Sequence, residues 1–138
     1  MPLDRHARRD TVARMSVPIV ALYAPLNAFL NIGLASKVVR QRMRGVTDTD
    51  KDLLLAIRIH GNNAEFVPLA LLMMLIAELS GGASLGLHLA GGLLLLARVS
   101  HAVGMPRRAP NPLRSFGVVV TWGTIVALAA YCLALRMR

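Results

Sequence analysis

The chain has 138 residues, of which 55% are hydrophobic, 17% charged and 4% aromatic, and its formal net charge is +9. So large an apolar fraction is atypical of a soluble domain, and so few aromatic residues argue against a surface that stacks nucleic-acid bases. The single cysteine, Cys132, excludes an internal disulfide framework and a cysteine-rich metal site, so we expect no bound metal.

Four long apolar runs, separated by short polar or basic connections, predict four membrane-spanning helices. The expected ranges are 16–39, 53–79, 85–103 and 113–135. We therefore expect residues 1–138 to form one all-α domain, an integral membrane four-helix bundle. Basic residues flank the apolar runs, as membrane-boundary anchors do, so the positive charge does not indicate a nucleic-acid partner.

The first run follows a polar, basic tail at residues 1–15. It is longer than the apolar part of a signal peptide, so we expect an uncleaved first helix. Asn27 and Asn31 share a face of this helix, and we expect them to form hydrogen bonds to neighbouring helices.

The second apolar run contains polar and charged side chains that are rare in membrane spans. At 3.6 residues per turn, Arg58, Asn62 and Glu65 lie on one face of the predicted helix. Charged groups at the centre of a span cost about 2.5–3.5 kcal/mol each, so they usually face a bundle interior or a watery cavity. Arg58 and Glu65 are about 10 Å apart along the axis, roughly the length of an extended tripeptide. This face suits a small zwitterionic peptide, with an interhelical polar clamp as the alternative.

Polar residues at the two ends of this second helix have structural interpretations. Thr49 or Asp50 is expected to cap its start, because either side chain can accept from a free backbone N–H. Glu78, at the other end, is expected to be solvated at the membrane boundary.

The third and fourth helices add a second group of candidate site residues. Arg98 and His101 share a face at the end of the third helix, and Arg114 and Ser115 open the fourth. The free N–H groups and positive dipole at a helix start favour an anion such as a thiolate or carboxylate. Four spans place the following residues on one side of the membrane: Arg40, Arg58, Arg98, His101 and Arg114. The lysines and arginines of the first and third connections favour a cytoplasmic location for these loops.

Four motifs stand out: Arg58-x-His60-x-Asn62-x-x-Glu65, Arg98-x-x-His101, Arg114-Ser115 and Val39-Arg40-x-Arg42. Together they resemble the MAPEG family, membrane-associated proteins in eicosanoid and glutathione metabolism. The second and third motifs match the pattern of its prostaglandin E synthase branch. The resemblance covers about residues 17–135 and is nearest to short bacterial members, which implies the bacterial inner membrane.

The resemblance implies a homotrimer of four-helix subunits that binds glutathione between neighbouring subunits. Arg58, Asn62 and Glu65 would hold the backbone and charged ends of the tripeptide, and Arg40 would reach in from the adjacent subunit. The pocket would be completed by Arg98, His101 and Arg114. The thiolate would be stabilised by Arg114 or Ser115, which are the implied catalytic residues.

These implications predict a glutathione-dependent membrane transferase or peroxidase that acts on lipophilic electrophiles. The catalytic branches of the family carry tyrosines where this chain has residues such as Met105 and Val118, and Gly61 replaces a basic residue common in the motif. The alternative is therefore a non-catalytic scaffold that binds a lipid or peptide. A small transporter is a third reading, opposed by the crowding of polar residues on one side of the membrane.

Overall fold

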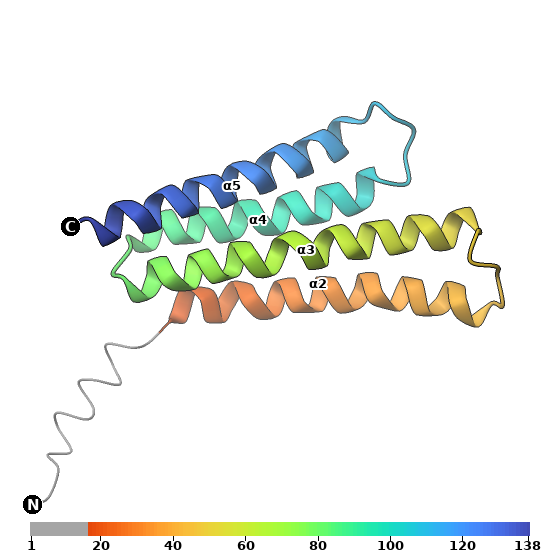
Figure 1. The fold of residues 1–138 in the computed structure, drawn as a ribbon, viewed down its shortest axis with the longest axis horizontal. Coiled ribbons are helices and arrows are strands. Elements are labelled where there is room, and N and C mark those ends of the chain that lie inside the picture. Colours follow the sequence, from red (N-terminus) through yellow and green to blue (C-terminus); the bar gives the residue numbers. More distant parts are fainter. Residues whose placement is uncertain (1–16) are drawn as a thin grey trace, which may run out of the picture.

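The computed structural model describes residues 17–138, which form four antiparallel helices joined by short connections (Figure 1). The helices are α2 (Pro18–Met43), α3 (Lys51–Leu79), α4 (Ser84–Gly104) and α5 (Pro112–Arg136). Each is long and apolar enough to cross a membrane. The predicted all-α membrane bundle of four helices is confirmed, whereas the predicted tail at residues 1–15 lies outside the described residues.

The helix ends follow from local sequence. α2 continues to Met43, four residues beyond its expected end at 39. Asp50, not Thr49, caps α3, because its carboxylate accepts hydrogen bonds from the N–H groups of Asp52 and Leu53, both at 2.9 Å.

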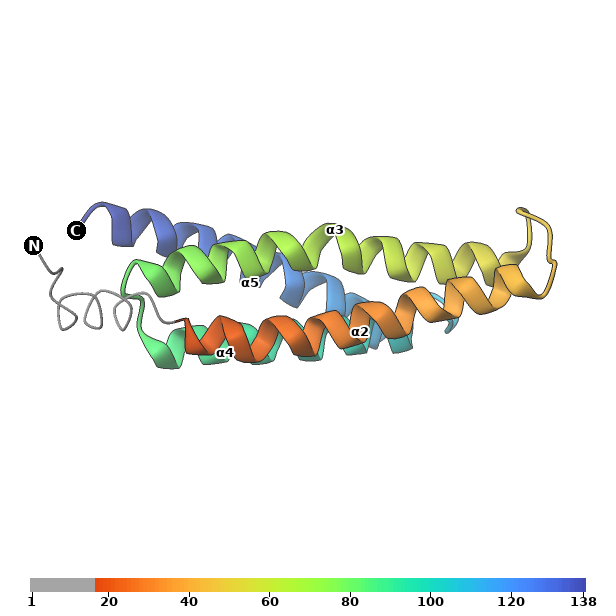
Figure 2. The ribbon, with the colours of Figure 1, turned by 90° about the horizontal axis from the view of Figure 1, so that it is seen from below.

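The bundle has two distinct ends. We call the end with the α2–α3 and α4–α5 connections the loop end, and the end with the α3–α4 connection and the C-terminus the terminal end (Figure 1). α3 packs against each of the other three helices, and α2 packs against α3 and α4. Figure 2 shows α5 crossing behind α3, on the far side from α2.

Apolar side chains form the core in two separate clusters. A small cluster near the loop end contains Val38, Leu53 and Ala56. A larger one near the terminal end contains Ile19, Val20, Met74, Ala77, Leu87 and Leu128. Four buried polar residues, one from each helix, lie toward the middle of the helices: Asn27, Asn63, Arg98 and Thr121. A group of polar side chains is therefore buried in the middle of the bundle among apolar ones such as Val67 and Leu94.

Two glycines allow α4 and α5 to approach closely at the loop end. A Cβ atom at Gly117 would lie 2.5 Å from the Cβ of His101, and one at Gly104 would lie 2.5 Å from the backbone nitrogen of Arg114. Gly123, two turns further along α5, has no such neighbour within 4 Å. The two helices thus touch at the loop end and are further apart toward the terminal end.

Long-range hydrogen bonds join the helices at the terminal end. The carboxylate of Glu78 accepts from the N–H groups of Ile19 and Val20, both at 2.8 Å. Val17, at the N-cap of α2, makes no side-chain cap of its own, so the end of α3 caps the start of α2. The expectation that Glu78 is merely solvated is therefore wrong.

Candidate functional site

A polar cavity of about 460 Å³ lies among α3, α4 and α5 in the loop-end half of the bundle. Arg58, Asn62 and Glu65 come from α3, whose 3.6-residue period places them on one face. α4 contributes His101 and α5 contributes Arg114. The remaining lining residues are apolar or small: Ile57, Gly61, Met105 and Val118. The cavity thus gathers five of the eight candidate site residues, and its size is that of a small-molecule site.

Arg58 and Glu65 supply opposite charges to the cavity. Neither side chain forms a hydrogen bond within residues 17–138, where the interhelical hydrogen bonds of this part of α3 come from Asn62 and Asn63. Glu65 is the fifteenth of the 29 residues of α3, so it lies near the middle of the span. Both side chains are exposed on the single chain. The two charges are therefore not joined in a clamp within the bundle, and they remain available to a ligand or a second copy.

His101 adds a buried imidazole to the same cavity. The residue is only 3% exposed, and neither ring nitrogen has a hydrogen-bond partner within residues 17–138. Buried polar groups in proteins are nearly always paired. This imidazole is therefore an unpaired polar group buried in the wall of the cavity.

At the first turn of α5, the side chain of Arg114, and not the backbone N–H groups, can bind an anion. The Oδ1 atom of Asn111 accepts from the N–H groups of Leu113 at 3.0 Å and Arg114 at 3.3 Å. The N–H of Ser115 donates to the carbonyl of Asn111 at 3.0 Å. The expectation of free N–H groups at this helix start is wrong, because the Asn111 cap occupies them. The guanidinium of Arg114 and the helix dipole remain as the positive groups.

Arg98 lies behind the cavity and does not line it. The residue is 2% exposed, and its guanidinium donates to Asn62 Oδ1 at 2.7 Å, Asn63 Oδ1 at 3.1 Å and Thr121 Oγ1 at 3.4 Å. All three acceptors are neutral, so hydrogen bonds and not a carboxylate compensate this charge. Because Asn62 lines the cavity, Arg98 fixes one cavity side chain from inside the bundle.

The hydrogen bonds of Arg98 belong to a network that connects all four helices. Asn63 donates to Asn31 Oδ1 of α2 at 3.1 Å, which confirms the interhelical bond expected for Asn31. Asn27 donates instead to a carbonyl of its own helix at 2.9 Å. Asn63 is not among the site residues expected from the sequence. Consecutive amides point about 100° apart on a helix, so the Asn62–Asn63 pair was the signal for two polar faces.

Two candidate residues lie at other cavities. Arg40 lines a basic cavity of about 270 Å³ between α2 and α3, with Lys37 and Arg44. Ser115 lines a cavity of about 330 Å³ at the start of α5, which shares Arg114 with the main cavity. Within one chain, neither Arg40 nor Ser115 lines the cavity that contains Arg58 and Glu65.

Comparisons with known proteins agree with the motif analysis. The model of the MAPEG family matches residues 20–134. Two relatives are each described as inner membrane protein YecN, one from Escherichia coli K12 and one from E. coli O6:H1 strain CFT073. Each is 37% identical to this chain over 114 residues, which cover 80% of this chain and 86% of the relative. No solved structure matches significantly.

Proposed function

The chain belongs to the MAPEG family, and on that premise we propose that it is a glutathione-dependent membrane transferase or peroxidase acting on lipophilic electrophiles. The observation that carries the proposal is the cavity with free charges of both signs, Arg58 and Glu65, inside a membrane span. Glutathione is a tripeptide with two carboxylates, one ammonium group and one thiol. A cavity that offers arginines, a carboxylate and an amide has the complementary groups.

The proposed binding mode follows from the positions of the charged groups. Arg58 binds a carboxylate of the tripeptide, and Glu65 binds its ammonium group about 10 Å further along α3. Asn62, whose Oδ1 atom already accepts from Arg98, offers its NH2 group to a peptide carbonyl between them. Arg98 is accordingly a positioning residue that acts through Asn62.

The chemical step requires a thiolate, which the chain stabilises with Arg114 in this proposal. The thiol loses its proton to solvent water, the sulfur attacks an electrophilic carbon and the leaving group departs with the electron pair of the bond that breaks. A guanidinium near the sulfur favours the anionic form. Met105 and Val118 make the nearby wall apolar, so no phenol donates a hydrogen bond from those positions.

We further propose that the working form is a homotrimer whose subunits share the site. Arg58 and Glu65 are exposed on the single chain, and Glu65, near the centre of the span, would face lipid at a cost of about 2.5–3.5 kcal/mol. A neighbouring copy that covers them removes this cost, and its Arg40 can then reach the cavity. We place the protein in a bacterial inner membrane with the loop end cytoplasmic, because the relatives are named as inner membrane proteins and cytoplasmic glutathione then meets the cavity.

The catalytic assignment is tested by replacing Arg114. Detergent-purified protein is expected to bind glutathione and to conjugate a generic aryl halide with it. Arg114→Ala is expected to reduce kcat by about 100-fold, as loss of one preorganised electrostatic group typically does. Arg107→Ala, in the α4–α5 connection and absent from the cavity wall, is the matched control. The kcat of Ser115→Ala, measured in the same assay, decides whether the Ser115 hydroxyl contributes to turnover. Turnover that is unchanged in Arg114→Ala would remove the assignment.

A non-catalytic binding protein is the second candidate, and the apolar side chains of Met105 and Val118 favour it. Titration calorimetry and turnover assays on the same sample separate the two functions. Glutathione binding that depends on Arg58 and Glu65, with no conjugation of several electrophiles, supports the binding protein.

A further inference from the structure

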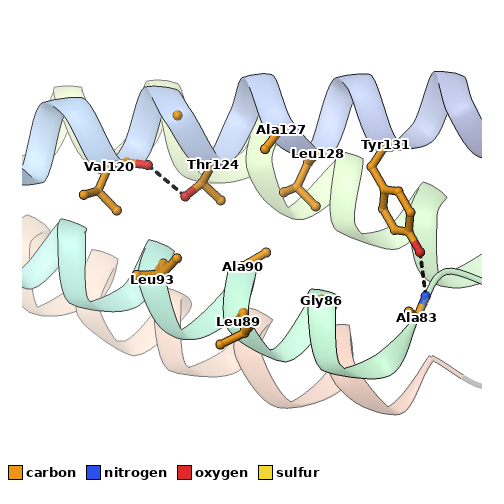
Figure 3. Close-up of a pocket in the computed structure, with 11 residues that line it drawn as sticks. Ala83, Gly86, Leu89, Ala90, Leu93, Val120, Thr124, Ala127, Leu128 and Tyr131 are labelled. Atoms are coloured by element: carbon orange, nitrogen blue, oxygen red, sulfur yellow. Dashed lines mark hydrogen bonds between the residues drawn. The ribbon is translucent and has the colours of Figure 1, made fainter.

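A second, apolar cavity of about 590 Å³ lies between α4 and α5 in the terminal-end half of the bundle (Figure 3). One wall is α4, from Ala83 to Leu93, and the other is α5, from Val120 to Tyr131. Most of the side chains between these limits are small or aliphatic: Gly86, Leu89, Ala90, Gly123, Ala127 and Leu128. None of them belongs to the polar cavity, so this groove is a separate feature.

The groove exists because α4 and α5 diverge. Gly117 and Gly104 hold the helices in contact at the loop end, where an added Cβ would meet the other helix at 2.5 Å. At Gly86 and Gly123, inside the groove, an added Cβ would meet nothing within 4 Å. Figure 3 shows the space that this divergence leaves between the two helices.

Both hydroxyl groups of the groove already have one hydrogen-bond partner. The hydroxyl of Thr124 donates to the carbonyl of Val120 at 2.8 Å, and the hydroxyl of Tyr131 accepts from the N–H of Ala83 at 2.7 Å (Figure 3). Within residues 17–138 the O–H proton of Tyr131, at the outer end of the groove, has no acceptor, and the rest of the lining is almost wholly apolar. The groove therefore suits an apolar occupant.

The length of the groove identifies the apolar occupant. The wall residues of α4 and α5 span ten and eleven steps, or about 15–16 Å at 1.5 Å per residue. Half of the ~30 Å hydrocarbon core is about 15 Å, the depth of one lipid leaflet. Tyr131 marks the outer end, where tyrosine is enriched at membrane interfaces. A transmembrane helix of a second copy would cross both leaflets, and a groove that closes at mid-membrane does not accommodate it.

We propose that this groove binds one acyl chain of a phospholipid from the leaflet at the terminal end. The headgroup then lies beyond Tyr131. Arg136 is five residues further along α5, about 7.5 Å, which is close to the ~5–7 Å thickness of the headgroup region on each side. An arginine at that level favours an anionic phosphate.

Native mass spectrometry tests the proposal by counting lipids that stay bound. Wild-type protein is loaded with phosphatidylglycerol in mixed micelles and washed with detergent. We expect one phosphatidylglycerol per chain to be retained. Ala127→Phe fills the groove and is expected to reduce retention at least about tenfold, because several methylene contacts are lost. Val126→Phe adds a ring of the same size at a position that is 68% exposed and absent from the groove wall, and should retain the lipid.

Three outcomes would overturn the proposal: no retained lipid on the wild type, equal retention by Ala127→Phe, or a change in copy number without a change in lipid count. The last outcome would identify the groove as a protein interface. Gly86→Leu fills it from the opposite wall and replaces Ala127→Phe if that variant melts early. Glutathione binding, measured on the same samples, should be unchanged, so this test does not depend on the proposed enzyme activity.

Discussion

Arg98 shows how a single side chain links the stability of the bundle to the cavity. Its three acceptors, Asn62, Asn63 and Thr121, lie on two other helices, and none of them is charged. A guanidinium can address three acceptors at once because its donors form a fixed planar fork, whereas an ammonium group is a point charge. The residue is therefore better suited to this position than lysine.

Replacing Arg98 with methionine is expected to destabilise the protein by about 1–3 kcal/mol, since buried acceptors lose their donors. Thermal unfolding in detergent measures the change. Arg98→Lys should restore the charge but only part of the stability. Arg108→Met, in the exposed α4–α5 connection, is the control and should unfold like the wild type. In the stable variants, glutathione affinity should fall with Arg98→Lys because Asn62 is no longer held. If Arg98→Met unfolded at the wild-type temperature, the network would contribute nothing to stability.

At this scale the sequence identified the cavity residues but not every contact they make. The spacing of Arg58, Asn62 and Glu65 was sufficient to place them on one face, because helical geometry is local. The pairing of Asn63 with Asn31 and the capping of α2 by Glu78 join residues 32 and 59 positions apart. Such pairings depend on how the helices dock, which periodicity alone does not determine.

The spacing between α4 and α5 depends on which glycines of α5 contact α4 and which do not. Gly117 is buried against His101, while Gly123 faces open space on the same helix. A methyl group at Gly117 would push α5 away from α4 and distort the cavity wall that both helices share. A methyl group at Gly123 meets no neighbour and improves helix propensity.

Gly117→Ala is therefore expected to destabilise the protein by about 1–3 kcal/mol, the usual range for overpacking, and to weaken glutathione binding. Gly123→Ala is the matched control on the same helix and should leave stability unchanged or raised by up to about 1 kcal/mol. Thermal melts and calorimetry on both variants provide the comparison. Equal behaviour of the two variants would contradict the close packing of α4 and α5.

The elements themselves were the most predictable part of the fold. Four apolar runs fix four spans, since length and hydropathy decide membrane insertion with little help from tertiary contacts. The helix ends were less predictable. α2 continues to Met43 through a stretch with Lys37, Arg40 and Arg42, where charge indicated an end but helix propensity continues the helix.

For the whole molecule, the proposed shared site makes a prediction about mixed assemblies. Arg40 and Arg58 lie at different cavities of one chain, so in the proposed trimer they would share a site only across subunits. Arg40→Ala and Arg58→Ala are each expected to lose glutathione binding. When the two variants are co-expressed in equal amounts, about one quarter of the sites should combine an intact Arg40 with an intact Arg58 from a neighbour. Calorimetry should then detect glutathione binding at that fraction of the sites.

The same experiment carries its own controls. Mixing the two purified variants under conditions without subunit exchange should restore no glutathione binding. Co-expression of Arg58→Ala with Glu65→Ala should also recover nothing, because both residues come from one helix of the same chain. Full binding by Arg40→Ala alone would show that the site is complete within one subunit.

The network through Asn31, Asn63, Arg98 and Thr121 also constrains how the protein is made. During synthesis the third span leaves the translocation machinery before Thr121 has emerged, so its arginine enters the bilayer short of one acceptor. A lone arginine at the centre of a span costs about 2.5–3.5 kcal/mol on insertion scales. The earlier hairpin already carries two of the required amides, Asn62 and Asn63, so we expect it to stay close to the emerging α4 and to offset part of this cost. We therefore expect an ordered assembly, in which the first two spans pack against the third before the fourth adds Thr121 to the network.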